Sequence, residues 1–108
     1  MSPFRSISDL QEVIHRLHGA IATHRESVPV REILEGETVW DGIVEVFHLD
    51  GHPLTERAYG WVHETGDPRN PFRYVTVLHI HPALTPAAAV QAFVAQEFRA
   101  NASEEAEA

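Results

Sequence analysis

Two runs of β-branched and aromatic residues, joined by Asp50-Gly51, restrict the fold of this chain more than any other feature. The first run is TVWDGIVEVFHL and the second is HPLTERAYGWVHE. Asp-Gly is a preferred two-residue turn, because both of its positions need a positive φ angle that these residues tolerate. The sequence therefore predicts an antiparallel hairpin in which Leu49 faces His52 and Trp40 faces Trp61.

Further strands are predicted on both sides of this hairpin. Residues 73–81, RYVTVLHIH, are rich in β-branched residues and are followed by Pro82, which ends a strand because it lacks an N–H donor. Before the hairpin, residues 30–34 predict one short strand ahead of a turn at residues 35–37. The sequence thus predicts a meander of three to four antiparallel strands.

Helical periodicity flanks the strands at both ends of the chain. A capping-box pattern, Ser8 to Gln11, accompanies apolar residues at spacings of four, three and four, which predicts a helix of roughly 16 residues. These apolar residues are Leu10, Ile14, Leu17 and Ile21. Near the other end, Thr85-Pro86 is typical of a helix N-cap and first helical position. A second amphipathic helix of roughly 14 residues is predicted to follow.

This order of elements, α-(β)-β-β-β-α, predicts the α+β class. We expect a two-layer sandwich, with the N-terminal and C-terminal helices on one face of the antiparallel meander. The 108 residues fit a single domain, which we expect to span residues 1–100. Residues 101–108 are small and acidic, and we expect them to form a disordered tail.

The α-β-β-β-α order resembles the double-stranded-RNA-binding fold in topology. That family grips phosphates with a lysine-rich start to its last helix, whereas residues 85–89 of this chain read Thr-Pro-Ala-Ala-Ala. The formal charge is −8, and none of the cations is a lysine. Nucleic-acid binding is driven by cations that replace counterions, so a nucleic-acid partner is disfavoured.

Composition sets the expected compartment. The chain contains no cysteine, which excludes disulfides, thiolate metal sites and cysteine nucleophiles. No stretch of about 18 apolar residues occurs, so we expect no membrane span. The N-terminal segment MSPFRSISDLQEV has no apolar run typical of a signal peptide. A cytoplasmic protein is the expectation.

Both faces of the predicted sheet are apolar, although helices on one face would cover that face alone. One of these faces is aromatic, and we call it the aromatic face: Trp40, Val44, Val46, Tyr59 and Trp61. Aromatic residues are enriched at the centres of protein interfaces. The sequence predicts that this face contacts a protein partner, most simply a second copy in a two-fold homodimer. The alternative is that the aromatic residues fill the core.

The chain has eight histidines, and their placement is informative. In a meander, the edge formed by the ends of strands one and three and the start of strand two collects His48, His52, His79 and His81. His79 and His81 share a strand face, roughly 6.5–7 Å apart. With His52 as a third ligand they predict a zinc site. The alternative is a row of half-exposed histidines bonded to water or to backbone carbonyls, with no cofactor.

No catalytic signature accompanies these features. The chain has neither a GxSxG nucleophile turn nor a glycine-rich phosphate loop, and Glu45 and Glu56 are predicted to face each other as a like-charge pair. We therefore expect a small non-enzymatic binding or adaptor module that acts through its aromatic face as a homodimer. A metal-binding or small-ligand-binding protein at the histidine edge is the alternative, and a nucleic-acid-binding domain is a second one.

Overall fold

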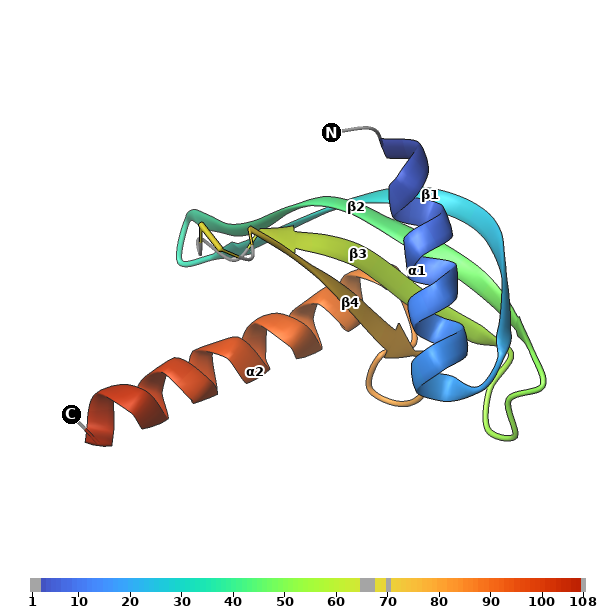
Figure 1. Ribbon diagram of the computed structural model, residues 1–108. Coiled ribbons are helices and arrows are strands. Elements are labelled where there is room, and N and C mark those ends of the chain that lie inside the picture. Colours follow the sequence, from blue (N-terminus) through green and yellow to red (C-terminus); the bar gives the residue numbers. More distant parts are fainter. Residues whose placement is uncertain (1–2, 65–67, 70, 108) are drawn as a thin grey trace.

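The computed structural model describes residues 3–64, 68–69 and 71–107, and it confirms the α+β class (Figure 1). The strands form one antiparallel sheet in the order β1-β2-β3-β4, so every neighbour in the sheet is a neighbour in the sequence. The elements are α1 (Pro3–His18), β1 (Ile21–Leu34), β2 (Glu37–Asp50), β3 (Arg57–Glu64), β4 (Phe72–Leu78) and α2 (Pro86–Glu107). None of the helices in the described part of the chain is long and apolar enough to span a membrane.

The first helix is shorter at its C-terminal end than the sequence predicts, and the strand after it is longer. Gly19 has a φ angle of 69° and donates its N–H to the carbonyl oxygen of His15 at 3.0 Å, which ends α1. Ile21, the last apolar position of the predicted helix, is the first residue of β1 and is 63% exposed. β1 has 14 residues instead of the short strand predicted at residues 30–34.

The hairpin between β2 and β3 forms, but its register differs from the prediction. Glu45 pairs with Gly60 and His48 pairs with Arg57, and the loop runs from residue 51 to residue 56. The predicted facing pairs Leu49–His52, Trp40–Trp61 and Glu45–Glu56 are therefore wrong. Pro53 lies in this loop, and it would have no N–H to donate to the ladder if the strand began after a two-residue turn.

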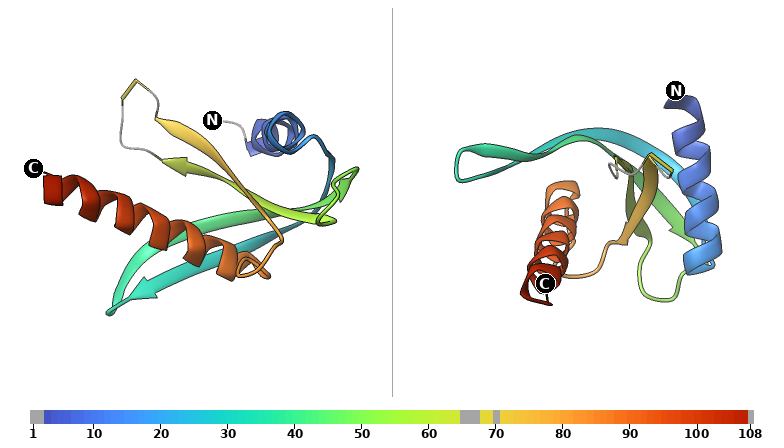
Figure 2. Two further views of the ribbon diagram at one scale, coloured as in Figure 1. Left: turned by 90° about the horizontal axis from the view of Figure 1, so that it is seen from below. Right: turned by 60° about the vertical axis from the view of Figure 1, so that its left-hand side comes forward.

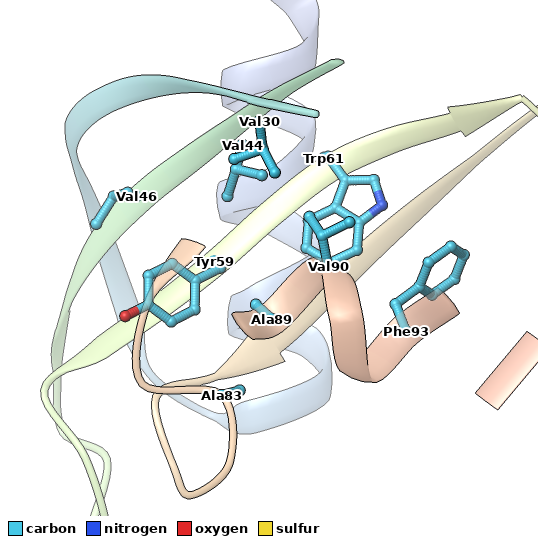
Figure 3. Close-up of a cluster of buried hydrophobic side chains, with 9 residues drawn as sticks. All are labelled: Val30, Val44, Val46, Tyr59, Trp61, Ala83, Ala89, Val90 and Phe93. Carbon is cyan, nitrogen blue, oxygen red and sulfur yellow. The ribbon is translucent and has the colours of Figure 1, made fainter. Parts of the chain in front are cut away.

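The two helices lie on opposite faces of the sheet, which corrects their predicted placement on one face (Figure 2). Successive side chains of a strand point to opposite faces, so Phe47 packs under α1 while Val46 packs under α2. The α1 cluster consists of Leu10, Ile14, Ala20, Ala22, Phe47, Leu49 and Ala58. The α2 cluster consists of Val30, Val44, Val46, Tyr59, Trp61, Ala83, Ala89, Val90 and Phe93 (Figure 3).

α1 approaches the sheet closely because β3 carries a glycine beneath it. A Cβ atom at Gly60 would lie 3.1 Å from Cδ2 of Leu10, a residue with no exposed surface. Two side-chain contacts also join α1 to β4. The Tyr74 hydroxyl donates to Asp9, and His18 Nε2 lies 3.2 Å from Thr76 Oγ1.

The N-terminus of α2 agrees with the prediction, and its C-terminal part does not. The backbone N–H of Ala88 donates to Thr85 Oγ1 at 3.0 Å, so Thr85 is the N-cap. The helix then continues to Glu107, beyond the roughly 14 residues that the sequence predicts. Residue 108 lies outside the described residues.

Candidate functional site

The aromatic face lies under α2 (Figure 3). Tyr59 is 0% exposed and Trp61 is 1% exposed, and the ring of Phe93 on α2 contacts Trp61 edge-on with 5.5 Å between the ring centroids. Val44 and Val46 are also buried, and Trp40 packs at the margin of the same cluster. Four of these residues therefore belong to the core, which is the alternative that the sequence left open, and Trp40 is half-buried beside it. The four buried residues are not accessible to a partner while α2 is in place.

The three histidines of the predicted zinc site are not brought together. His79 is bound to the Tyr59 hydroxyl, with 2.6 Å between Nδ1 and the oxygen. His52 instead contacts His18 of α1, with 6.4 Å between the ring centroids, and His81 is exposed beyond the end of β4. Among the residues that the structure describes, no group of three or more His, Cys, Asp or Glu side chains could hold a metal ion.

Two of the four edge histidines lie at one end of the sheet face under α2, with Arg57 between them. His48 on β2 pairs with Arg57 on β3, and the N–H of His79 donates to the carbonyl oxygen of Arg57 at 2.9 Å. Opposite residues of antiparallel strands have Cβ atoms about 4.5–5.5 Å apart on the same face. His48, Arg57 and His79 thus form a line across three strands, which we call the basic row.

The basic row forms one wall of an open cavity of about 610 Å³. Loop residues Leu54, Thr55 and Glu56 contribute to its lining, and so do Arg25 and Glu26 of β1. Arg25 is the extra residue of a β-bulge, since the register with β2 shifts between His24 and Glu26. Pockets of about 300–1,000 Å³ are typical of small-molecule sites.

The two arginines of the cavity have unused hydrogen-bonding capacity. Neither Arg25 nor Arg57 has an ion-pair partner among the residues that the structure describes. Each guanidinium carries five N–H donors in a planar fork that matches a carboxylate or a phosphate. Glu26 and Glu56 also line the cavity, so the wall presents carboxylates beside its cationic groups.

The bond between Tyr59 and His79 holds one imidazole of the basic row in place. It involves Nδ1, which leaves Nε2 for other contacts. When the hydroxyl donates to Nδ1, the neutral ring carries its proton on Nε2, and Nε2–H is a hydrogen-bond donor. His48 has a different polar neighbour, since its Nε2 lies 3.6 Å from Asp50 Oδ1. The row therefore combines a cation with two imidazoles that differ in their neighbours.

A polar cluster on the α1 side of the sheet is not predicted by any pattern in the sequence. His24 Nε2 lies 2.9 Å from Glu45 Oε1, and the Ser27 hydroxyl donates to the same carboxylate oxygen. The hydroxyl is also 3.4 Å from His24 Nε2. Serine and carboxylate thus contact one ring nitrogen, whereas a catalytic triad places them on the two different nitrogens. The geometry satisfies a mostly buried carboxylate and does not activate a nucleophile.

Comparisons of the chain with protein-family models, with curated proteins and with solved structures found no match. The functional interpretation therefore rests on the cavity and the basic row.

Proposed function

We propose that this chain is a non-enzymatic binding protein that holds a small ligand with an anionic group in the cavity beside the basic row. One observation carries the proposal. Arg57 stands between two imidazoles on the wall of the cavity, and among the described residues it has no carboxylate partner. This develops the small-ligand alternative for the histidine edge and requires no metal ion.

The anionic group would bind to the guanidinium of Arg57. A carboxylate or a phosphate accepts two parallel N–H bonds from an arginine, and such charge-assisted bonds are roughly twice as strong as neutral ones. His79 Nε2 offers a further donor on the same wall, and Arg25 offers a second cation in the lining of the cavity. Leu54 and Val46 give the rest of the ligand an apolar surface.

Binding accounts for this site better than catalysis does. Thr55 is the one hydroxyl residue among those that line the cavity, and its Oγ1 already contacts the backbone of Arg57 as donor and acceptor. His79 is held by Tyr59 rather than by a carboxylate that would increase its basicity. A nucleophile paired with an oriented general base is therefore not formed by the described residues of this wall.

Isothermal titration calorimetry with inorganic phosphate and with citrate tests the proposal. We expect saturable binding of at least one anion to the native chain. Arg57→Gln should weaken that binding at least about tenfold, because it removes a charge-assisted contact. The control is Arg31→Gln, which removes an exposed arginine paired with Asp41 at 3.4 Å and leaves the cavity lining unchanged.

The proposal fails if neither anion binds to the native chain below roughly 10 mM. It also fails if Arg57→Gln and Arg31→Gln reduce binding equally, because the effect would then reflect net charge and not the cavity. A nuclear magnetic resonance titration would locate the site independently, through shifts at His79 and Arg57 on addition of phosphate.

A further inference from the structure

The sheet has two edges, and β1 is the protected one. Pro29 in β1 has no N–H to offer to another strand, and the bulge at Arg25 interrupts the ladder. Exposed charged residues also occur along this strand, among them Glu26 and Arg31. Proline, bulges and charges are the devices by which proteins prevent the pairing of an edge strand with another chain.

β4, the other edge, has fewer of these devices, since Arg73 is its one charged residue. It reads FRYVTVL, with one charged residue and no proline, and its pairing with β3 runs without a bulge from Phe72 to Leu78. Figure 1 shows β4 as the outer strand on the side facing the viewer, between α1 and α2. A regular, β-branched edge strand of this kind is a template for strand addition.

The hydrogen-bond pattern shows which groups this edge displays. The N–H of His79 donates to Arg57 across the β3–β4 pair, so odd-numbered residues of β4 bond to β3. On the other side of β3, the N–H of Leu49 donates to the carbonyl oxygen of Glu56. Even-numbered residues of β3 therefore bond to β2, and odd-numbered residues of β3 bond to β4. The N–H groups of Thr76 and Leu78 therefore point away from the sheet, and no acceptor for them occurs among the described residues.

A groove with both apolar and polar walls runs beside this edge. It has a volume of about 320 Å³ and lies between β4 and α2, with Val75 and Val77 on one side and Ala92 and Phe93 on the other. Its polar lining residues are Arg73, Thr76 and Gln96. An added strand would place alternate side chains over this groove while its backbone bonds to β4. The edge thus offers both main-chain groups and side-chain contacts.

We infer that β4 pairs antiparallel with β4 of a second copy of this chain about a two-fold axis at Thr76. In this register the two Thr76 residues exchange N–H···O bonds, and Val75 of each copy lies opposite Val77 of the other. Both copies thereby contribute the same groove, which is the self-complementarity that a two-fold interface requires. The result is a continuous eight-stranded sheet, four strands from each copy, whose remaining edges are the two protected β1 strands.

Pairing with a second copy accounts for the unpaired β4 edge better than binding of a peptide from another protein. The pairing uses a strand that this chain already holds extended, and it removes the single unprotected edge of the described sheet. The dimer interface differs from the aromatic face, which is buried under α2. It also differs from the cavity, whose lining shares no residue with the groove, so the two proposals can fail separately.

Sedimentation velocity between roughly 10 µM and 1 mM tests the inference. The native chain should dimerise in this range. Thr76→Pro should raise the dissociation constant at least roughly tenfold, because it removes one central hydrogen bond from each copy. Thr76→Val is the matched control, since it also removes the hydroxyl near His18 but keeps the N–H, and it should still dimerise. A monomeric native chain at every concentration would overturn the inference, as would a folded Thr76→Pro variant that dimerises normally.

Hydrogen exchange gives a second readout on the native chain, should Thr76→Pro fail to fold. The Thr76 amide should exchange slowly at concentrations where the chain is dimeric and rapidly on dilution. The Val77 amide, which faces β3, should stay protected at both concentrations. Rapid exchange at Thr76 within the dimer would show that another surface mediates the association.

Discussion

His18 lies in the last turn of α1, where a protonated imidazole normally interacts favourably with the helix dipole. Its surroundings act in the opposite direction. Burial and, secondarily, the positive charge of His52 lower the pKa of His18 from the ordinary value of 6.5. The ring also contacts Thr76 of β4, so one side chain joins the end of α1, the β2–β3 loop and the edge strand. A proton on His18 therefore disfavours this junction.

Replacing His18 should reduce the pH dependence of stability. Because the pKa of His18 is lower in the folded state, the unfolded chain binds more protons as the pH falls below about 6.5. The contribution of His18 is thus complete above that pH and is lost as the pH falls through the lowered pKa. Urea unfolding of the native chain and of His18→Gln at pH 5 and pH 8 would measure this. We expect the native chain to lose more stability than His18→Gln on acidification, and an equal loss would contradict the assignment.

Single residues also show where sequence interpretation reaches its limit. The Thr85 cap could be predicted, because it depends on local backbone chemistry. The two-residue turn predicted at Asp50-Gly51 does not form, since Asp50 still belongs to β2 and the loop runs from residue 51 to residue 56. The roles of Arg57 and Arg25 could not be predicted. Arg57 joins the basic row because the observed register of β3 on β2 is shifted by four positions from the register that a two-residue turn would give. Arg25 reaches the cavity because it is the extra residue of a bulge. Register and bulges depend on tertiary packing, and no local pattern reports them.

At the scale of the elements, the contact between α1 and β3 depends on a missing side chain. Gly60 leaves the space that Leu10 fills, and Phe47 lies 3.4 Å from the position that a Cβ atom would take. The sequence predicts both elements but not their contact, because a glycine in a strand has several possible explanations.

The length of β1 also differs from the short strand that the sequence predicts. Pro29 and the polar residues around it argue against a strand, and the structure tolerates them because β1 is an edge.

Filling the space at Gly60 should destabilise the chain. Gly60→Val forces side-chain atoms into Leu10 and Phe47, and overpacking of this kind costs about 1–3 kcal/mol. Urea denaturation of the native chain, Gly60→Val, Leu10→Ala and the double variant forms a double-mutant cycle. The cost of Gly60→Val should be smaller in the Leu10→Ala background, since the truncated side chain leaves room. Strictly additive effects would show that the glycine does not set the position of α1.

At the scale of the whole molecule, the sheet separates two apolar clusters, and each helix closes one of them. The excess of apolar surface on the strands was visible in the sequence, but what covers it was not. A helix at either end of the chain can pack on either face of the sheet. The spacing of its apolar residues does not indicate which face it covers. α2 crosses to the aromatic side, with Ala83 buried in the loop that precedes it.

This arrangement makes α2 the element on which the aromatic cluster depends. Phe93 is 7% exposed and contacts Trp61 at 5.5 Å and His63 at 5.0 Å between ring centroids. Phe93→Ala should lower the free energy of unfolding by roughly 3 kcal/mol or more, because it opens a cavity above Trp61. Ile33→Ala is the control, since Ile33 is 60% exposed and its truncation should change stability by about 0.5 kcal/mol or less.

Tryptophan fluorescence would show whether that loss arises at the aromatic face. In Phe93→Ala, water gains access to Trp61, so the emission maximum of the folded chain should shift to longer wavelength, whereas the emission of Ile33→Ala should match that of the native chain. A Phe93→Ala variant with native stability and native emission would mean that α2 does not hold the aromatic residues out of water. The aromatic face would then be open to a partner, and the β4 edge would lose its place as the preferred interface.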